Sequence, residues 1–306
     1  MMLLSFPIGV FVIFNTDIGG DINFQYPLSS IAIFEKIDYR IPFDIEIGDV
    51  FIVLWSIYAI LFAISMFGPD KGFLKALAAN LSHEKLETKS NYIIIIAKWF
   101  SILILISIII DFIQQGFGIA TVPPLVKNDL TQFLYVSASP IVEEFGFRVI
   151  LIGLPLFVFY SYKLSIKHFF KSLWNPNRNL HIYDFKKSLF LIVLVGIFFG
   201  LAHIITGEPW SEGKFAQATV SGIILGWLYL RFGLITAILV HWATNYFIFA
   251  YANFLSQINE ITIEEAFSHP LINTMEILFL ISGVFSISVL LINYFNSKKE
   301  QKLKIE

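Results

Sequence analysis

Long, uninterrupted apolar runs are the feature that most constrains the fold of this sequence. Several runs of about 18 or more apolar residues match the roughly 30 Å of hydrocarbon that a spanning helix must cross. The composition agrees, because 57% of the 306 residues are hydrophobic and only 14% are charged. Only helices and closed barrels satisfy their backbone hydrogen bonds in lipid. We therefore expect an all-α fold, a polytopic transmembrane helix bundle.

Seven apolar runs predict spanning helices, and an eighth run is shorter. The seven lie at about 50–67, 91–113, 131–160, 188–206, 215–231, 233–252 and 271–295. Met1 to Phe14 is apolar but lacks the basic start and the small-residue cleavage site of a signal peptide. We interpret it as an uncleaved short span, so that about eight spans are predicted.

Basic residues alternate between the loops that connect these runs. Lysine and arginine gather in the loop after the 50–67 run, in 161–187 and in the tail after 295, whereas 15–49 and 253–270 are mainly acidic. Because cytoplasmic loops of membrane proteins accumulate lysine and arginine, we expect both termini to lie in the cytoplasm. The protein is then a multi-pass protein, expected in the cell membrane of a prokaryote.

The chain is interpreted as one membrane domain in three parts. Residues 1–130 hold the N-terminal spans with the extracytoplasmic segment 15–49, residues 131–252 hold the core spans, and residues 253–306 hold the last span and the basic tail. A net charge of −2 and a pI near 6.3 give no indication of nucleic-acid binding. The absence of cysteine excludes disulfides and thiolate chemistry. The oligomeric state is not indicated.

Two acids and one base lie inside the 131–160 run, where each charge costs roughly 2.5–3.5 kcal/mol on insertion. On an α-helix, Glu144 and Arg148 are four residues apart and can neutralise each other, whereas Glu143 points about 100° away and has no local partner. An unpaired carboxylate in an apolar interior suits a general acid or base. A purely structural ion-pair cluster is the alternative.

Two histidines also lie in apolar runs. His203 is near the end of the 188–206 run, and His241 lies in the 233–252 run four residues before Asn245. That spacing puts His241 and Asn245 on one helix face, where they can converge on one ligand. A lone membrane histidine is more often a packing residue, but three spans here each supply a polar group.

Other features narrow the chemistry. The sequence has no H-E-x-x-H zinc motif, no G-x-S-G and no G-x-G-D. Asp111 lies near a span end and is expected at the membrane interface. Glycine pairs at four-residue spacing permit close packing between helices, namely Gly196 with Gly200 and Gly222 with Gly226.

These motifs together resemble a known family. The order E-E-x-x-x-R at Glu143 to Arg148, F-x-x-x-H at Phe199 to His203 and H-x-x-x-N at His241 to Asn245 is similar to that of the CPBP family, which holds the type II CAAX prenyl endopeptidases and bacteriocin-processing membrane proteases. The resemblance covers about 131–252. Each motif alone occurs in many proteins, but the three in this order on separate spans are specific to the family.

The resemblance implies an intramembrane endopeptidase that acts on membrane-associated substrates, including prenylated C-a-a-X proteins. It implies that Glu143 and His203 activate a water, that His241 and Asn245 stabilise the oxyanion, and that Glu144 with Arg148 holds the helix geometry. The expected partners are membrane lipid and a membrane-anchored protein or peptide.

The cofactor requirement stays open. Glu143, His203 and His241 are also a plausible zinc-binding set. We favour a metal-free reaction.

Two other functions stay open. A non-catalytic membrane scaffold or immunity protein of the same family would share the motifs. A proton-coupled transporter could use the buried acid and histidines as a relay, but internal repeats typical of transporters are not visible.

Overall fold

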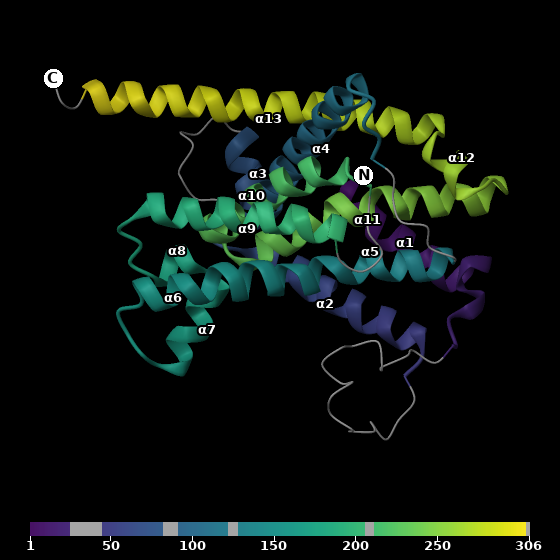
Figure 1. The fold of residues 1–306 in the computed structure, drawn as a ribbon, viewed down its shortest axis with the longest axis horizontal. Coiled ribbons are helices and arrows are strands. Elements are labelled where there is room, and N and C mark those ends of the chain that lie inside the picture. The colour runs from purple at the N-terminus through teal and green to yellow at the C-terminus, as the bar shows by residue number, and fades with distance from the viewer. Residues whose placement is uncertain (25–44, 82–90, 122–127, 206–210, 304–306) are drawn as a thin grey trace.

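The computed structural model describes residues 1–24, 45–81, 91–121, 128–205 and 211–303 (Figure 1). These residues fold into helices and contain no β-strand, so the predicted all-α membrane bundle is confirmed. The α-helices are α1 (Ser5–Asn15), α2 (Ile47–Phe67), α3 (Phe73–Leu81), α4 (Tyr92–Gly116), α5 (Asp129–Glu143), α6 (Leu154–Tyr160), α7 (Ile166–Trp174), α8 (Pro176–Asn179), α9 (Phe185–Ile205), α10 (Lys214–Phe232), α11 (Leu234–Asn259), α12 (Ile263–Phe267) and α13 (Pro270–Leu303). Two 3-10 turns, η1 (Met2–Leu4) and η2 (Asp17–Asp21), flank α1, and the π-helix η4 (Glu144–Gly153) joins α5 to α6.

Five helices within the described residues are long and apolar enough to cross a membrane. They are α2, α4, α9, α11 and the stretch Ile263–Asn296, which includes most of α13. They correspond to five of the seven strong predicted runs. The 131–160 run is helical through α5, η4 and α6, the 215–231 run is α10, and the first run forms a shorter apolar helix. The total of about eight spans therefore stays a prediction.

Helix α11 is the centre of the bundle. It contacts α1, α4, α5 and α10, and 78% of its apolar window is buried inside the protein, against 11% for Ile263–Asn296. A helix that is apolar on nearly all sides is expected at the core of a bundle. In Figure 1, α13 runs along one edge of the molecule and packs mainly against α4. Polar side chains on α11 therefore face protein on most sides.

Helices α9 and α10 pack closely through glycine, as the sequence predicts. A Cβ atom added at Gly196 would lie 2.9 Å from the backbone nitrogen of Ile223, and one at Gly200 would lie 2.9 Å from the carbonyl oxygen of Phe215. Larger residues would separate the two helices. The close contact holds the His203 end of α9 against the first turns of α10.

A tight turn at Gly233 places α10 beside α11. Gly233 has a φ of 95°, in the left-handed region that glycine adopts without steric cost, and its N–H donates to the carbonyl of Tyr229 at 2.9 Å. The amide of Asn175 donates to the carbonyl of Phe232 at 3.3 Å and satisfies another group at this helix end. Helix α10 consequently runs back along the part of α11 that carries His241 and Asn245, and the two helices line one cavity.

Candidate active site

The helix that carries the two glutamates changes form between them. Regular α-helix ends at Glu143, and residues from Glu144 to Gly153 form a π-helix. The prediction of a regular 3.6-residue helix at this point is therefore wrong, and the physical reason is a wider turn with i to i+5 hydrogen bonds. π-helical turns of this kind are frequent at functional sites.

Glu144 is held in a closed, buried network. Its Oε2 atom lies 3.0 Å from Nε of Arg148, and both side chains are 0% exposed, so the predicted i,i+4 pair is confirmed. Its other oxygen, Oε1, accepts from Nδ1 of His241 at 2.8 Å. Arg148 also lies 3.5 Å from the carbonyl of Gly222 through Nη2. Glu144 therefore fixes a catalytic candidate on α11 as well as its own helix.

Phe199 packs between the buried pair and the two histidines. The guanidinium carbon of Arg148 lies 4.6 Å from the centre of the Phe199 ring, a distance typical of a cation–π contact. The same ring contacts His203 at 4.6 Å and His241 at 5.9 Å, both edge to face. The sequence placed Phe199 in a motif but gave it no role. Its ring limits the orientation of both imidazoles.

Glu143 lies within reach of both histidines. Its Oε2 atom is 4.0 Å from Nε2 of His203 and 3.7 Å from Nε2 of His241, and it has no hydrogen-bond partner within the described residues. The Glu143 side chain is 26% exposed, in contrast to Glu144. The absence of a partner on its own helix was predicted. The structure supplies neighbours from α9 and α11 instead.

The outer contacts of both histidines determine which ring nitrogen carries hydrogen. Nδ1 of His203 lies 2.8 Å from the carbonyl oxygen of Phe199, which can only accept, so Nδ1 donates. Nδ1 of His241 likewise donates to the carboxylate of Glu144. In the neutral rings, both Nε2 atoms then carry lone pairs. Three acceptor atoms, two Nε2 and one Oε2, converge on one point.

Asn245 completes this group from the next turn of α11. Its Nδ2 atom lies 3.1 Å from Nε2 of His241 and 3.4 Å from Oγ of Ser139 on α5. The prediction that His241 and Asn245 share one helix face is therefore confirmed. The Asn245 amide could therefore donate a hydrogen bond to a substrate atom in place of His241 or Ser139.

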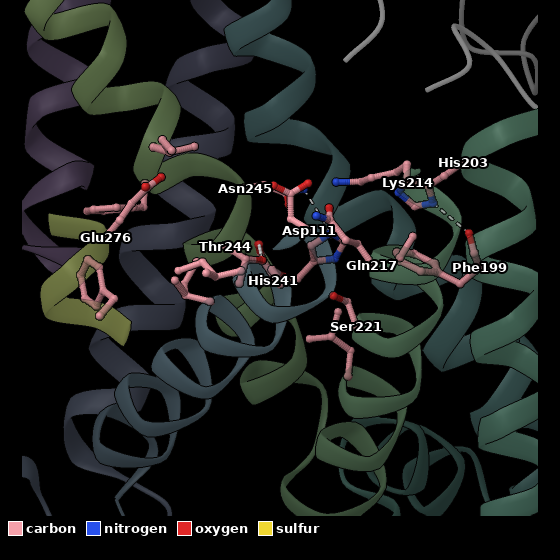
Figure 2. A pocket seen from close by; sticks show the side chains of 18 residues that line it. Asp111, Phe199, His203, Lys214, Gln217, Ser221, His241, Thr244, Asn245 and Glu276 are labelled. Atoms are coloured by element: carbon pink, nitrogen blue, oxygen red, sulfur yellow. Dashed lines mark hydrogen bonds between the residues drawn. The ribbon is translucent and has the colours of Figure 1, made fainter. Parts of the chain in front are cut away.

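Phe199, His203, His241 and Asn245 line a cavity of about 390 Å³ between α4, α9, α10, α11 and α13, and Glu143 lies next to its two histidines. Figure 2 shows His203, His241 and Asn245 on its walls, together with side chains from α4 and α10. The cavity is large enough for water and for part of a peptide side chain or backbone. The converging acceptors thus lie beside space that a substrate can enter.

Sequence reasoning missed several polar groups of this cavity. Lys214 and Gln217 on α10 and Glu276 on α13 line it, and so does Asp111 on α4, which was expected at the membrane interface. Asp111 accepts a hydrogen bond from Nε2 of Gln115 at 2.7 Å. None of these residues belongs to a recognisable motif. They lie near the ends of apolar runs, where polar residues are usually expected at the membrane interface.

The proposed metal ligands do not form a compact set. Zinc bonds of about 2.0–2.1 Å imply neighbouring ligand atoms about 3.4 Å apart in a tetrahedral site. Oε2 of Glu143 is 4.0 Å from Nε2 of His203 and 3.7 Å from Nε2 of His241, and the part of the chain described by the structure contains no cluster of three such residues with metal-site geometry. The donor chemistry fits zinc, but these side chains would have to move closer together.

Comparison with known protein families finds a similarity in this part of the chain. Residues 128–247 match the family of type II CAAX prenyl endopeptidases described as Rce1-like. This match confirms the resemblance that was inferred from the motifs.

The matched segment contains Glu143, Glu144, Arg148, His203, His241 and Asn245. The long apolar helices of the described residues support an integral membrane protein. Comparison with curated proteins and with solved structures gives no match.

Proposed function

We propose that the protein is an intramembrane endopeptidase that hydrolyses peptide bonds of membrane-associated substrates, including prenylated C-a-a-X proteins. One observation carries the proposal: the carboxylate oxygen of Glu143 and the Nε2 atoms of His203 and His241 converge beside a cavity. Oε2 of Glu143 and Nε2 of His203 are two acceptors that suit a bound water, which has two hydrogens to donate, whereas Nε2 of His241 accepts from Asn245. The Rce1-like match over the same residues supports the same reaction class.

In this mechanism, Glu143 and His203 hold and activate the water. The water donates one hydrogen to each, and its oxygen attacks the carbonyl carbon of the scissile bond. Glu143 takes the proton as the carbon–oxygen bond forms, and then delivers it to the leaving nitrogen as the carbon–nitrogen bond breaks. His203 keeps its Nε2 lone pair toward the water because Phe199 occupies Nδ1.

His241 and Asn245 would stabilise the oxyanion. For His241 this role needs a hydrogen on Nε2 as well as on Nδ1, and the Glu144 carboxylate, 2.8 Å from Nδ1, lies where it can balance the charge of such a ring. Protonation of Nε2 also removes the acceptor that Asn245 now uses, so the amide N–H is released toward the oxyanion. Donors held in place before reaction are the most effective form of such stabilisation.

The test is cleavage by purified protein in liposomes. A fluorogenic farnesylated C-a-a-X peptide and a library of other lipidated and transmembrane peptides would serve as substrates. We expect wild-type protein to cut at least one of them. Failure to cut any, with the wild type and Glu143→Gln indistinguishable in cells, would favour a non-catalytic scaffold or immunity protein.

A zinc-dependent reaction is the second candidate mechanism. Nδ1 of His241 donates to Glu144, and such a carboxylate contact is typical of histidines that bind zinc. Glu143, His203 and His241 would hold the ion, which would supply the activation of water. In that case, activity lost in His241→Ala would track lost metal content, whereas a metal-free reaction leaves activity unchanged after complete metal removal.

The predicted topology is part of the proposal. Charge alternation puts 161–187 and the C-terminal lysines in the cytoplasm and 253–270 outside. A cysteine introduced at Glu260 should react with an impermeant thiol reagent from the outside. Labelling only from the cytoplasm would contradict this orientation.

A further inference from the structure

A polar stripe on α10 faces the candidate active site. Lys214, Gln217 and Ser221 lie three and four residues apart, on one side of the helix, and all three line the cavity with His203, His241 and Asn245. Figure 2 shows the Lys214 side chain extending into the cavity from the end where His203 lies. The proposed mechanism uses none of the three residues.

Lys214 differs in charge from the rest of the cavity wall. Among the described residues that line the cavity, it is the only lysine or arginine, whereas Asp111 and Glu276 are acids from α4 and α13. Figure 2 shows the Lys214 side chain beside His203, and both residues line the cavity. The cavity therefore has a cationic group close to the proposed water and acidic groups on other helices.

This distribution of charge favours one orientation of a bound peptide. An anionic group on the substrate is attracted to Lys214 and repelled by Asp111 and Glu276. A peptide within the membrane carries one anion regardless of its side chains, namely its C-terminal carboxylate. An ammonium group that is shielded from water binds a carboxylate more strongly than a neutral donor does.

We propose that Lys214 binds the C-terminal carboxylate of the substrate and so fixes the distance from the chain end to the scissile bond. This inference rests on the proposed function. An extended chain advances about 3.3–3.6 Å per residue, so the separation between Lys214 and the water held by Glu143 and His203 would set how many residues lie between the carboxylate and the scissile bond. Gln217 and Ser221 lie along the same stripe and can accept or donate hydrogen bonds to the intervening backbone.

The test compares two substrates that differ in one group. A lipidated peptide that the wild type cuts would be prepared with a free C-terminal carboxylate and with a C-terminal amide. We expect kcat/KM to be about 10- to 100-fold higher for the free acid, the scale of one charge-assisted hydrogen bond. In Lys214→Gln the preference should fall to within about threefold, through a higher KM for the acid and no change for the amide.

Matched variants sharpen the result. Lys214→Arg retains the charge and should retain most of the preference. Lys187→Gln removes an exposed lysine of α9 that pairs with Asp184 at 3.2 Å outside the cavity, so it should behave as wild type. An amidated peptide that ends in glutamate tests for a side-chain carboxylate, and a Lys214-dependent preference for that peptide would overturn the proposal.

Two results overturn the inference while the proposed function stands. One is a wild type that cuts acid and amide equally well. The other is a Lys214→Gln variant whose kcat/KM falls by the same factor on both substrates. Lys214 would then act on Glu143, on the acids Asp111 and Glu276 or on folding, and would not bind the carboxylate.

If the variant does not fold, inhibition of the wild type by short product peptides decides, since the free acid should inhibit at least about tenfold better than the amide. A wild type that cuts neither substrate refutes the function itself.

Discussion

The two adjacent glutamates face opposite sides of one site, and the sides differ in almost every physical respect. On the inner side, Glu144 and Arg148 are 0% exposed and form an ion pair, and Glu144 also accepts a hydrogen bond from His241. On the cavity side, the side chains of Glu143 and His203 are 26% and 18% exposed and lie 4.0 Å apart. One side is closed and held by an ion pair and a hydrogen bond, whereas the other leaves room for a water molecule. We infer that the inner side positions the site and the cavity side performs the chemistry.

The largest expected effect is on the cavity side. Glu143→Gln keeps the shape of the side chain but removes the base, so we expect the cleavage rate to fall by at least about 10²–10⁴-fold. Because Glu143 has no ion pair on its own helix, thermal stability in detergent should change little. A Glu143→Gln variant that retains cleavage would place the base elsewhere.

The next effect is on the inner side. Glu144→Ala leaves the guanidinium of Arg148 buried without its carboxylate, and breaking such a pair typically costs about 3–5 kcal/mol of folding stability. Thermal unfolding in detergent would measure the loss. The same stability as the wild type, together with an activity loss equal to that of Glu143→Gln, would contradict the division between the two sides.

Asn245 lies where the inner side and the cavity side meet, so its substitution tests the boundary between them. Its amide contacts His241, which belongs to the inner network, but it also lines the cavity. Asn245→Ala should lower kcat by about 10²–10³-fold, the scale of one lost oxyanion donor, with little change in substrate binding. Steady-state kinetics with the cleaved peptide would show it. A change confined to KM would assign Asn245 to substrate binding instead.

The smallest effect on activity and stability is expected for substitution of Val142, which belongs to neither side. Val142 precedes Glu143 on the same helix, but it is 68% exposed on the outer surface of the bundle. Val142→Leu should change stability by no more than about 0.5 kcal/mol and leave the cleavage rate unchanged. It is therefore the control for substitutions at 143 and 144. A large effect would mean that this face of α5 packs against something in the membrane.

Local spacing explains what the sequence could predict about this site. The pair of Glu144 with Arg148 and the shared face of His241 and Asn245 both depend on residues four apart, so the sequence alone predicts them. The apolar runs similarly predict the long helices, since a bilayer requires them.

Long-range contacts explain what the sequence could not predict. The contact of Glu144 with His241 joins residues 97 apart in the chain. The cavity gathers Asp111, Lys214 and Glu276 from α4, α10 and α13, and no local pattern relates these three. The π-helix after Glu143 also has no obvious signal in its residues.

The most direct test of the central claim is a single-turnover reaction in water enriched in ¹⁸O. Wild-type protein and Glu143→Gln would be reconstituted separately in liposomes of the same composition. Each would be mixed with less than one equivalent of a cleavable lipidated peptide, and the product masses would be measured by mass spectrometry. If Glu143 activates water for direct attack, the wild type yields a product whose new carboxyl group carries one ¹⁸O, and Glu143→Gln yields none. An unlabelled carboxyl group, or product formed by Glu143→Gln at the wild-type rate, would contradict it.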